Sequence, residues 1–260
     1  MYHEDLVESF DYNYYFPSSA GEDVDIVVLD TSFNFDYVEF KKPLNHIAKC
    51  RGYVGSNSKV IEVDSTSCGD LSHSHGRIVS DIVAGAIHGT AKNANIYGVS
   101  IPESEDYYIY MKDVLPALQY VLDYLIRPNK TVINISHRFL FEKGGDPYNQ
   151  YNDVINDIVR KGGIVVVSAG NDENDTDHNS KNGAQTIPCA LSNTICVGGI
   201  DSDQTKHFEK NYVKANGSNY GKSVDVWAPY IVNASILDGS KVITNKYYGT
   251  SFSAPLTAGI

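Results

Sequence analysis

Short runs of β-branched residues alternate along this chain with segments of helical periodicity, and this alternation restricts the fold more than any other feature. Strands are expected near residues 24–30, 58–63, 94–100, 131–136, 164–168 and 194–200, and helices near residues 75–88, 106–125 and 151–161. A strand that is apolar throughout is buried on both faces, as in a parallel sheet covered by helices. The sequence therefore predicts an α/β fold with three layers, α/β/α, around a mostly parallel central sheet.

Composition favours one large domain. The chain has 260 residues, and we expect residues 21–260 to form a single domain after a polar, tyrosine-rich arm at residues 1–20. The net charge of −11 argues against a nucleic-acid partner, because the phosphate backbone needs basic side chains. No stretch approaches 18 uninterrupted apolar residues, so no membrane span is expected.

Three polar residues follow or precede these elements at positions where open α/β sheets place their sites. Asp30 ends the strand predicted at 24–30, and Asn171 follows the strand predicted at 164–168. His75 comes just before the apolar face of the helix predicted at 75–88. Taken singly, each residue has a structural alternative: a strand-end cap, a turn asparagine or a residue at a helix N-terminus.

The run Gly249–Pro255 places a serine, Ser251, at the expected start of a helix, with Pro255 predicted within the first turn. A proline there would lose no intrahelical hydrogen bond. A serine at a helix N-terminus lies beside unpaired N–H groups and the positive end of the helix dipole, which suits a nucleophile whose intermediate carries an oxyanion. A simple small-residue entry into the helix is the alternative.

The chain order acid, histidine, serine is that of subtilisin, and no G-x-S-x-G elbow is present. Together with two further blocks, residues 89–99 and 218–229, these segments resemble the subtilisin-like serine proteases (subtilases, peptidase family S8) over roughly residues 20–260. The resemblance implies a serine endopeptidase that hydrolyses protein or peptide substrates through an acyl-enzyme and needs no cofactor for catalysis. It assigns Asp30, His75 and Ser251 as the catalytic triad and Asn171 as the oxyanion donor.

Some positions depart from the family pattern. Ser32 replaces a glycine after the catalytic acid, and Asp81 introduces a charge into the helix after the histidine. The segment Ser136-His137-Arg138 is expected to bind substrate, yet Arg138 and Phe139 replace two glycines that keep the family's cleft open. Either these side chains narrow or block the cleft, or they turn outward. A pseudoprotease that binds peptides or protein partners is therefore the alternative function, and an esterase stays open.

The four cysteines are expected to pair as Cys50–Cys68 and Cys189–Cys196, because each pair brackets a short loop; free thiols are the alternative. Disulfides and glycosylation would fit a secreted protein. Sequons in loop-like contexts begin at Asn129, Asn174, Asn216 and Asn233, whereas the sequon at Asn134 lies in a predicted strand.

Histidine spacing indicates no catalytic metal, although the Asp- and Asn-rich loop at 171–183 and the position of Asp225 leave a structural calcium ion open. The resemblance also implies a cleaved pro-segment and a monomer. Because the chain stops nine positions after Ser251 (260 minus 251), we expect it to be truncated at its C-terminus.

Overall fold

A computed structural model describes residues 15–41, 46–106, 108–178, 183–202 and 212–260. Six neighbouring strands form the parallel centre of the main sheet. In sheet order they are β11 (Ile195–Ser202), β9 (Gly163–Ser168), β7 (Thr131–Ile135), β1 (Asp25–Asp30), β6 (Asn95–Ser100) and β3 (Ala48–Val54). The remaining strands are antiparallel β4 (Val60–Ser65) and β12 (Tyr212–Lys214) at the edges, and β13 (Val226–Pro229), which runs parallel to β11.

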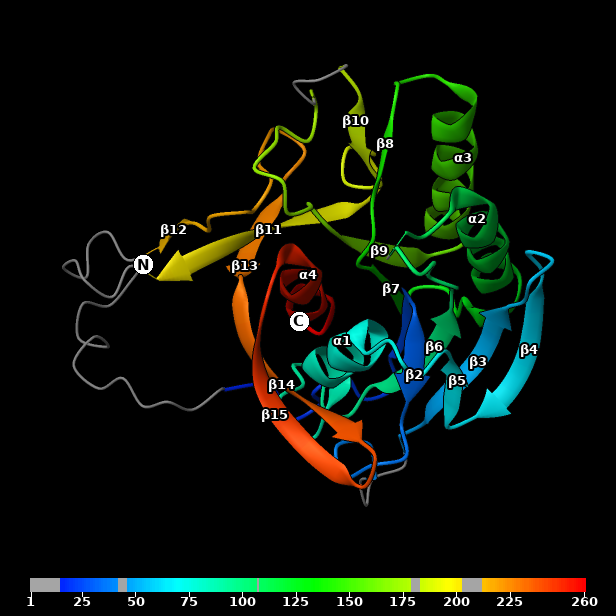
Figure 1. Ribbon diagram of the computed structural model, residues 1–260, viewed down its shortest axis with the longest axis vertical. Coiled ribbons are helices and arrows are strands. Elements are labelled where there is room, and N and C mark those ends of the chain that lie inside the picture. The colour runs from blue at the N-terminus through cyan, green and yellow to red at the C-terminus, as the bar shows by residue number, and fades with distance from the viewer. Residues whose placement is uncertain (1–14, 42–45, 107, 179–182, 203–211) are drawn as a thin grey trace.

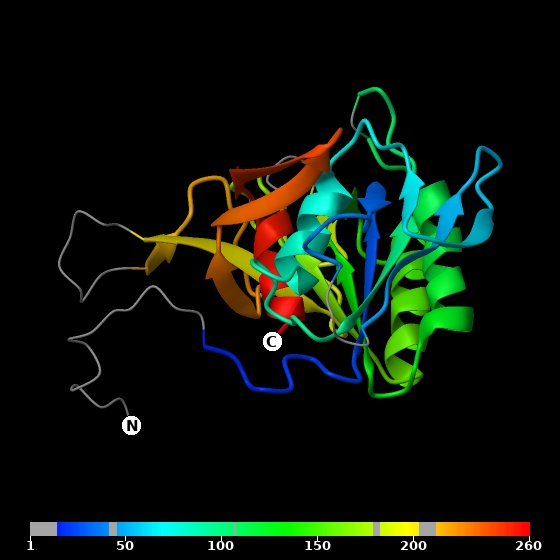
Figure 2. The ribbon, with the colours of Figure 1, turned by 90° about the horizontal axis from the view of Figure 1, so that it is seen from below.

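Two pairs of helices cover opposite faces of this sheet (Figures 1 and 2). One face carries α1 (His75–Ala84) and α4 (Thr250–Ala258), which pack against each other. The other carries α2 (Met111–Tyr120), continued by a π-helical turn (Val121–Leu125), and α3 (Asp146–Arg160). The predicted α/β/α layers are therefore confirmed.

Strand β1 shows why the apolar run is continuous. Its alternate residues Val27 and Leu29 pack into the cluster beneath α2 and α3, whereas Ile26 and Val28 pack into the cluster beneath α1 and α4. All four are at most 1% exposed. A central strand with a hydrophobic core on each face has no position left for a polar side chain, except at its end.

Several elements differ from the prediction. Helix α1 ends at Ala84, four residues early, because Gly85 has extended backbone dihedrals. Helix α2 starts at Met111, after an extended Tyr110, and residue 107 of the predicted helix lies outside the described residues. Helix α3 starts at Asp146, since Pro147 fits the first turn. The strand predicted at 58–63 is β4, an antiparallel edge strand.

The prediction omitted β3 and several smaller strand pairs. These are the hairpin of β14 (Ile231–Asp238) and β15 (Lys241–Tyr248), the pair of β2 (Ser32–Asn34) and β5 (Ser67–Gly69), and the pair of β8 (Phe139–Phe141) and β10 (Gln185–Ile187). The hairpin covers α1 and contacts α4. These pairs shape the surface around the carboxyl edge of the main sheet.

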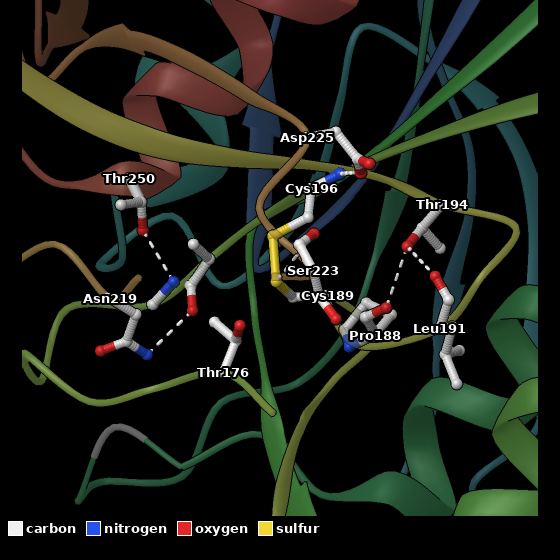
Figure 3. Close-up of a disulfide and its surroundings, with 12 residues drawn as sticks. Thr176, Pro188, Cys189, Leu191, Thr194, Cys196, Asn219, Ser223, Asp225 and Thr250 are labelled. Atoms are coloured by element: carbon white, nitrogen blue, oxygen red, sulfur yellow. Dashed lines mark hydrogen bonds between the residues drawn. A yellow bond between two sulfur atoms is a disulfide. The ribbon is translucent and has the colours of Figure 1, made fainter. Parts of the chain in front are cut away.

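Both predicted disulfides, Cys50–Cys68 and Cys189–Cys196, are present. The second joins the turn after β10 to β11, and Figure 3 shows it beside Asp225, which accepts the Cys196 N–H at 2.8 Å. None of the described helices is long and apolar enough to cross a membrane. Residues 1–14 of the predicted arm lie outside the described residues.

Candidate active site

Asp30 and His75 meet at the carboxyl end of β1, where α1 begins. The Nδ1 atom of His75 lies 2.9 Å from each carboxylate oxygen of Asp30. Asp30 is 3% exposed, and its Oδ1 also accepts the Thr31 N–H at 2.7 Å. The carboxylate is therefore held from two sides, and it fixes the orientation of the imidazole ring.

Two neighbouring residues bring α1 this close to β1. A Cβ atom on Gly76 would lie 2.5 Å from the Ser32 carbonyl oxygen and 3.0 Å from Asp30 Cβ, so only glycine fits here. The Ser32 hydroxyl donates to the His73 carbonyl oxygen at 2.6 Å. The serine that departs from the family pattern thus ties the acid segment to the loop before His75.

The contact between Asp30 and His75 shifts the pKa of both side chains. Burial on its own would raise the pKa of Asp30, but the His75 imidazole and the Thr31 N–H lower it overall. Burial on its own would lower the pKa of His75, but the Asp30 carboxylate raises it overall. The geometry therefore favours an ionised acid beside an imidazole that is readily protonated, as a general base in catalysis requires.

Ser251 is the second residue of α4, and its neighbour Phe252 lies against His75 with ring centroids 5.4 Å apart. The Ser251 hydroxyl donates to the Ser136 carbonyl oxygen at 3.2 Å, and the Ser136 hydroxyl donates back to the Ser251 carbonyl oxygen at 3.0 Å. These two bonds tie the start of α4 to the residue that follows β7. All three candidate triad residues thus lie at the carboxyl edge of the sheet.

The prediction for Pro255 was wrong in one respect. Pro255 is the sixth residue of α4 and lies in its second turn, where an ordinary residue would donate its N–H to the carbonyl of Ser251, four residues earlier. Proline has no N–H, which leaves that carbonyl oxygen available. Ser136 provides the missing hydrogen bond.

Asn171 lies in the turn after β9, and two residues that the sequence analysis did not select fix its position. The N–H and the hydroxyl of Thr250 both donate to Asn171 Oδ1 at 2.9 Å. Because Thr250 binds the oxygen of the Asn171 amide, the NH₂ group of that amide can donate to another acceptor. Buried Asn219, labelled in Figure 3, braces the same turn. Its side chain donates to Ala169 O at 2.9 Å and accepts the Asp172 N–H at 3.0 Å.

The segment Ser136-His137-Arg138 was predicted to bind substrate, and the side chains of Arg138 and its neighbour Phe139 point in different directions. Arg138 forms an ion pair with Asp172 and lies against Gly170, where a Cβ atom would be 2.7 Å from Arg138 Cδ. Phe139 instead is partly buried and packs against the core, with its ring stacked on that of Phe141. Arg138 therefore connects the segment after β7 to the turn that carries Asn171. Phe139 does not extend toward that turn, because its ring packs against the core.

His137 is partly buried near the Asp30–His75 pair. Its Nε2 lies 3.3 Å from the Tyr151 hydroxyl, and its ring contacts that of Phe139 edge-on. Burial, aided by the neighbouring His75, lowers the pKa of His137 to about 4. His137 is therefore neutral at physiological pH and adds no positive charge beside the His75 imidazole.

Three aspartates in the region where calcium was considered accept hydrogen bonds from other protein groups. Asp177 accepts the Ser223 hydroxyl at 2.6 Å, Asp175 accepts the Asp177 N–H at 2.9 Å, and Asp225 accepts the Cys196 N–H. Residues 179–182 of this loop lie outside the described residues. Calcium binding here stays a prediction.

The fold and the arrangement at its edge define a class of protein. A parallel α/β sheet that carries an acid at one strand end, a histidine at the start of one helix and a serine at the start of another is the framework of subtilisin-type serine hydrolases.

Comparisons with known proteins agree. The model of the subtilase family (peptidase S8) matches residues 21–260, and the chain belongs to this family.

The curated relatives include fungal proteins. "Subtilisin-like protease 2" of Arthroderma otae is 30% identical over 249 residues, which are 95% of this chain and 51% of that protein. The protein of the same name from Arthroderma benhamiae is 31% identical over the same extent. This chain thus spans about half the length of the curated relatives it matches.

Solved structures share the fold. A cold adapted subtilisin-like serine proteinase aligns with a TM-score of 0.70 and 21% identity, covering 96% of this chain and 78% of that chain. A lanthipeptide protease aligns with a TM-score of 0.70 and 19% identity, covering 92% of this chain and 72% of that chain.

Proposed function

We propose that this chain is the catalytic domain of a serine endopeptidase, with Asp30, His75 and Ser251 as its triad. The observation that carries the proposal is the position of the His75 imidazole. Its Nδ1 contacts both carboxylate oxygens of Asp30, and its ring lies against Phe252, on the helix that carries Ser251. This arrangement leaves Nε2 of His75 as the ring nitrogen that can accept a proton. Membership of the subtilase family supports the same reaction.

In the proposed reaction, His75 Nε2 accepts the Ser251 hydroxyl proton as Oγ attacks the carbonyl carbon of a peptide bond. Substrate binding must first turn this hydroxyl away from Ser136, whose carbonyl it contacts at 3.2 Å. The imidazolium, stabilised by Asp30, then protonates the leaving amine as the C–N bond breaks. Water hydrolyses the acyl-enzyme, and Ser251 recovers its proton.

Two N–H donors are available for the oxyanion that forms during this attack. One is the NH₂ group of Asn171, whose oxygen Thr250 holds. The other is the backbone N–H of Ser251, in the first turn of α4, where N–H groups have no intrahelical partner. Fixed donors of this kind stabilise the transition state without reorganisation.

The test of the proposal is covalent labelling with a fluorophosphonate probe. We expect the folded full-length protein to form an adduct at Ser251 Oγ, located by peptide mass spectrometry, because only a serine activated by a base reacts readily with such probes. The change Ser251→Ala should abolish labelling. Ser253→Ala is the matched control, since Ser253 lies on the same helix and its hydroxyl instead bonds Pro229 O at 2.9 Å. A folded protein that resists labelling would instead support the pseudoprotease.

Arg138 is expected to limit which substrates are cleaved. A substrate side chain that enters between Ser136 and the Asn171 turn meets the Arg138–Asp172 bridge. We predict that Arg138→Gly raises kcat/KM for peptides with a large apolar residue before the scissile bond by about tenfold, the scale of a pocket contact. Peptides with alanine there should change little.

Competition between the two peptide types in one reaction measures this ratio directly. The control Asp172→Asn removes the ion pair but keeps the arginine side chain, and it should have a smaller effect than Arg138→Gly. An unchanged ratio in Arg138→Gly would show that Arg138 does not restrict the cleft.

The two disulfides support a secreted protein, since such bonds persist in oxidising compartments. Three sequon asparagines, Asn129, Asn216 and Asn233, are exposed, whereas Asn134 is fully buried. Glycans would therefore be carried at the first three positions. A pro-segment removed on maturation and a monomeric enzyme belong to the same proposal.

A further inference from the structure

Three potential metal-ligating side chains gather at the far end of α1, away from Ser251. Asp81 lies on the last turn of this helix, His88 in the turn that follows it, and Glu39 in the turn after β2. Their ligand atoms all lie within 4.8 Å of one another. Glu39 and Asp81 are 1% and 0% exposed. The cluster includes Asp81, the charged residue by which this helix departs from the family pattern.

Backbone groups hold both carboxylates in place. The Ile87 N–H donates to Glu39 Oε2 at 2.7 Å, and the Ser235 N–H donates to Asp81 Oδ2 at 2.5 Å. The other oxygen of Glu39, Oε1, is buried, has no hydrogen-bond donor among the described residues, and lies 3.7 Å from His88 Nδ1. A buried carboxylate oxygen without a donor is costly, so this atom calls for a positive partner.

Two side chains that can carry a positive charge, Lys92 and His88, lie near this oxygen, but neither donates a hydrogen bond to it. Lys92 donates to the carbonyl oxygens of Ala86 and Ile87, on the outside of the turn. His88 Nδ1 instead lies 2.8 Å from Asp81 Oδ2, and this contact raises the pKa of His88. Burial raises the pKa of Glu39, and the charge of Asp81 raises it further. A divalent cation between the three groups would compensate both carboxylates at once.

The donor set indicates which cation. Calcium and magnesium prefer oxygen ligands only, whereas an imidazole nitrogen combined with carboxylate oxygens suits zinc. The backbone bonds to Glu39 Oε2 and Asp81 Oδ2 orient the ligands, as supporting hydrogen bonds do around metal sites. The His88 side chain is 16% exposed, which gives an ion a route from solvent.

We propose that Glu39, Asp81 and His88 bind one structural zinc ion, with water completing its coordination. Binding requires a deprotonated His88 Nδ1, so any proton there is released to solvent as the metal binds. The ion would join three elements: the turn after β2, the end of α1 and, through Asp81, strand β14. None of these ligands belongs to the proposed catalytic triad.

The test uses the full-length protein without a histidine tag, in a Ser251→Ala background that prevents self-cleavage. Competition against a chromophoric chelator measures zinc affinity and stoichiometry. We expect one zinc ion per chain, and a His88→Gln loss in affinity of at least the roughly 10–100-fold that follows removal of a group supporting a ligand. Zinc at 100 times its Kd should raise the Tm of the parent by about 5 °C. His178→Gln is the control, because His178 is an exposed histidine in a different loop.

X-ray absorption at the zinc edge gives a second readout that needs no substitution in the cluster, which protects the test if His88→Gln fails to fold. A single imidazole nitrogen with oxygen ligands would support the proposal. Absence of stoichiometric zinc, a site with two imidazoles, or an affinity that His88→Gln leaves unchanged would overturn it, and the cluster would then hold protons only.

Discussion

Replacing His75 with alanine is expected to lower kcat by about 10⁶-fold, the order found when a subtilisin loses its catalytic histidine or serine. The reason is that His75 is the base of Ser251 in the proposed triad, and the Asp30 carboxylate, which contacts His75, acts on Ser251 only through it. Ser251→Ala should cost about the same, and the double variant His75→Ala/Ser251→Ala hardly more than either. Steady-state hydrolysis of a peptide substrate measures all three.

The matched control for this series is His73→Ala. His73 lies two residues away and pairs with Glu103 at 2.7 Å, so its loss should leave most of the activity intact. Additive losses in the double variant would show that His75 and Ser251 do not act as a unit, and the proposed triad would be wrong.

Asp30→Asn is expected to lower kcat by about 10⁴-fold. The amide can donate a hydrogen bond to His75 Nδ1, which places the imidazole proton on Nε2, where a proton blocks its role as a base. The Asp30 carboxylate also raises the pKa of His75. Because activity is lost as pH falls through that pKa, the remaining activity of Asp30→Asn should persist to lower pH than that of the parent.

The pH dependence of kcat/KM for the two proteins tests both effects. Asp25→Asn is the control, since Asp25 is a buried acid on the same strand that bonds Asn95 Nδ2 at 2.8 Å, at the opposite end. It should leave the acid limb of the profile unchanged. An unshifted limb in Asp30→Asn would mean that Asp30 does not set the pKa of His75.

Local sequence predicted the strands of the sheet that are apolar nearly throughout, and also the edge strand β4, but it missed β3 and the smaller strand pairs. Strand β1 is apolar at each position between its two terminal aspartates and was predicted within one residue. Strand β3 lies in the same sheet, but Lys49 and Arg51 interrupt its apolar residues, so its pattern did not indicate a strand. The hairpin of β14 and β15 has mostly exposed or partly exposed side chains and gave no apolar signal either.

At the site, motifs identified the residues that the structure gathers at the sheet edge, but not the residues that position them. Thr250 bonds Asn171, 79 positions earlier, and Asn219 bonds Asp172, 47 positions earlier. Neither contact leaves a local pattern. The direction of Arg138 was equally open, because it depends on Asp172 in another loop. Long-range partners of this kind become visible only once the strand order is known.

Pro255 has an evolutionary consequence. An ordinary residue at this position would return an N–H to the carbonyl oxygen of Ser251, and that oxygen would then no longer need the Ser136 hydroxyl as its donor. The two positions, 119 apart in sequence (255 minus 136), therefore share one hydrogen-bond requirement. In an alignment of relatives they should covary: lineages that keep the proline should keep a hydroxyl at position 136, and lineages that lose one should be free to lose the other.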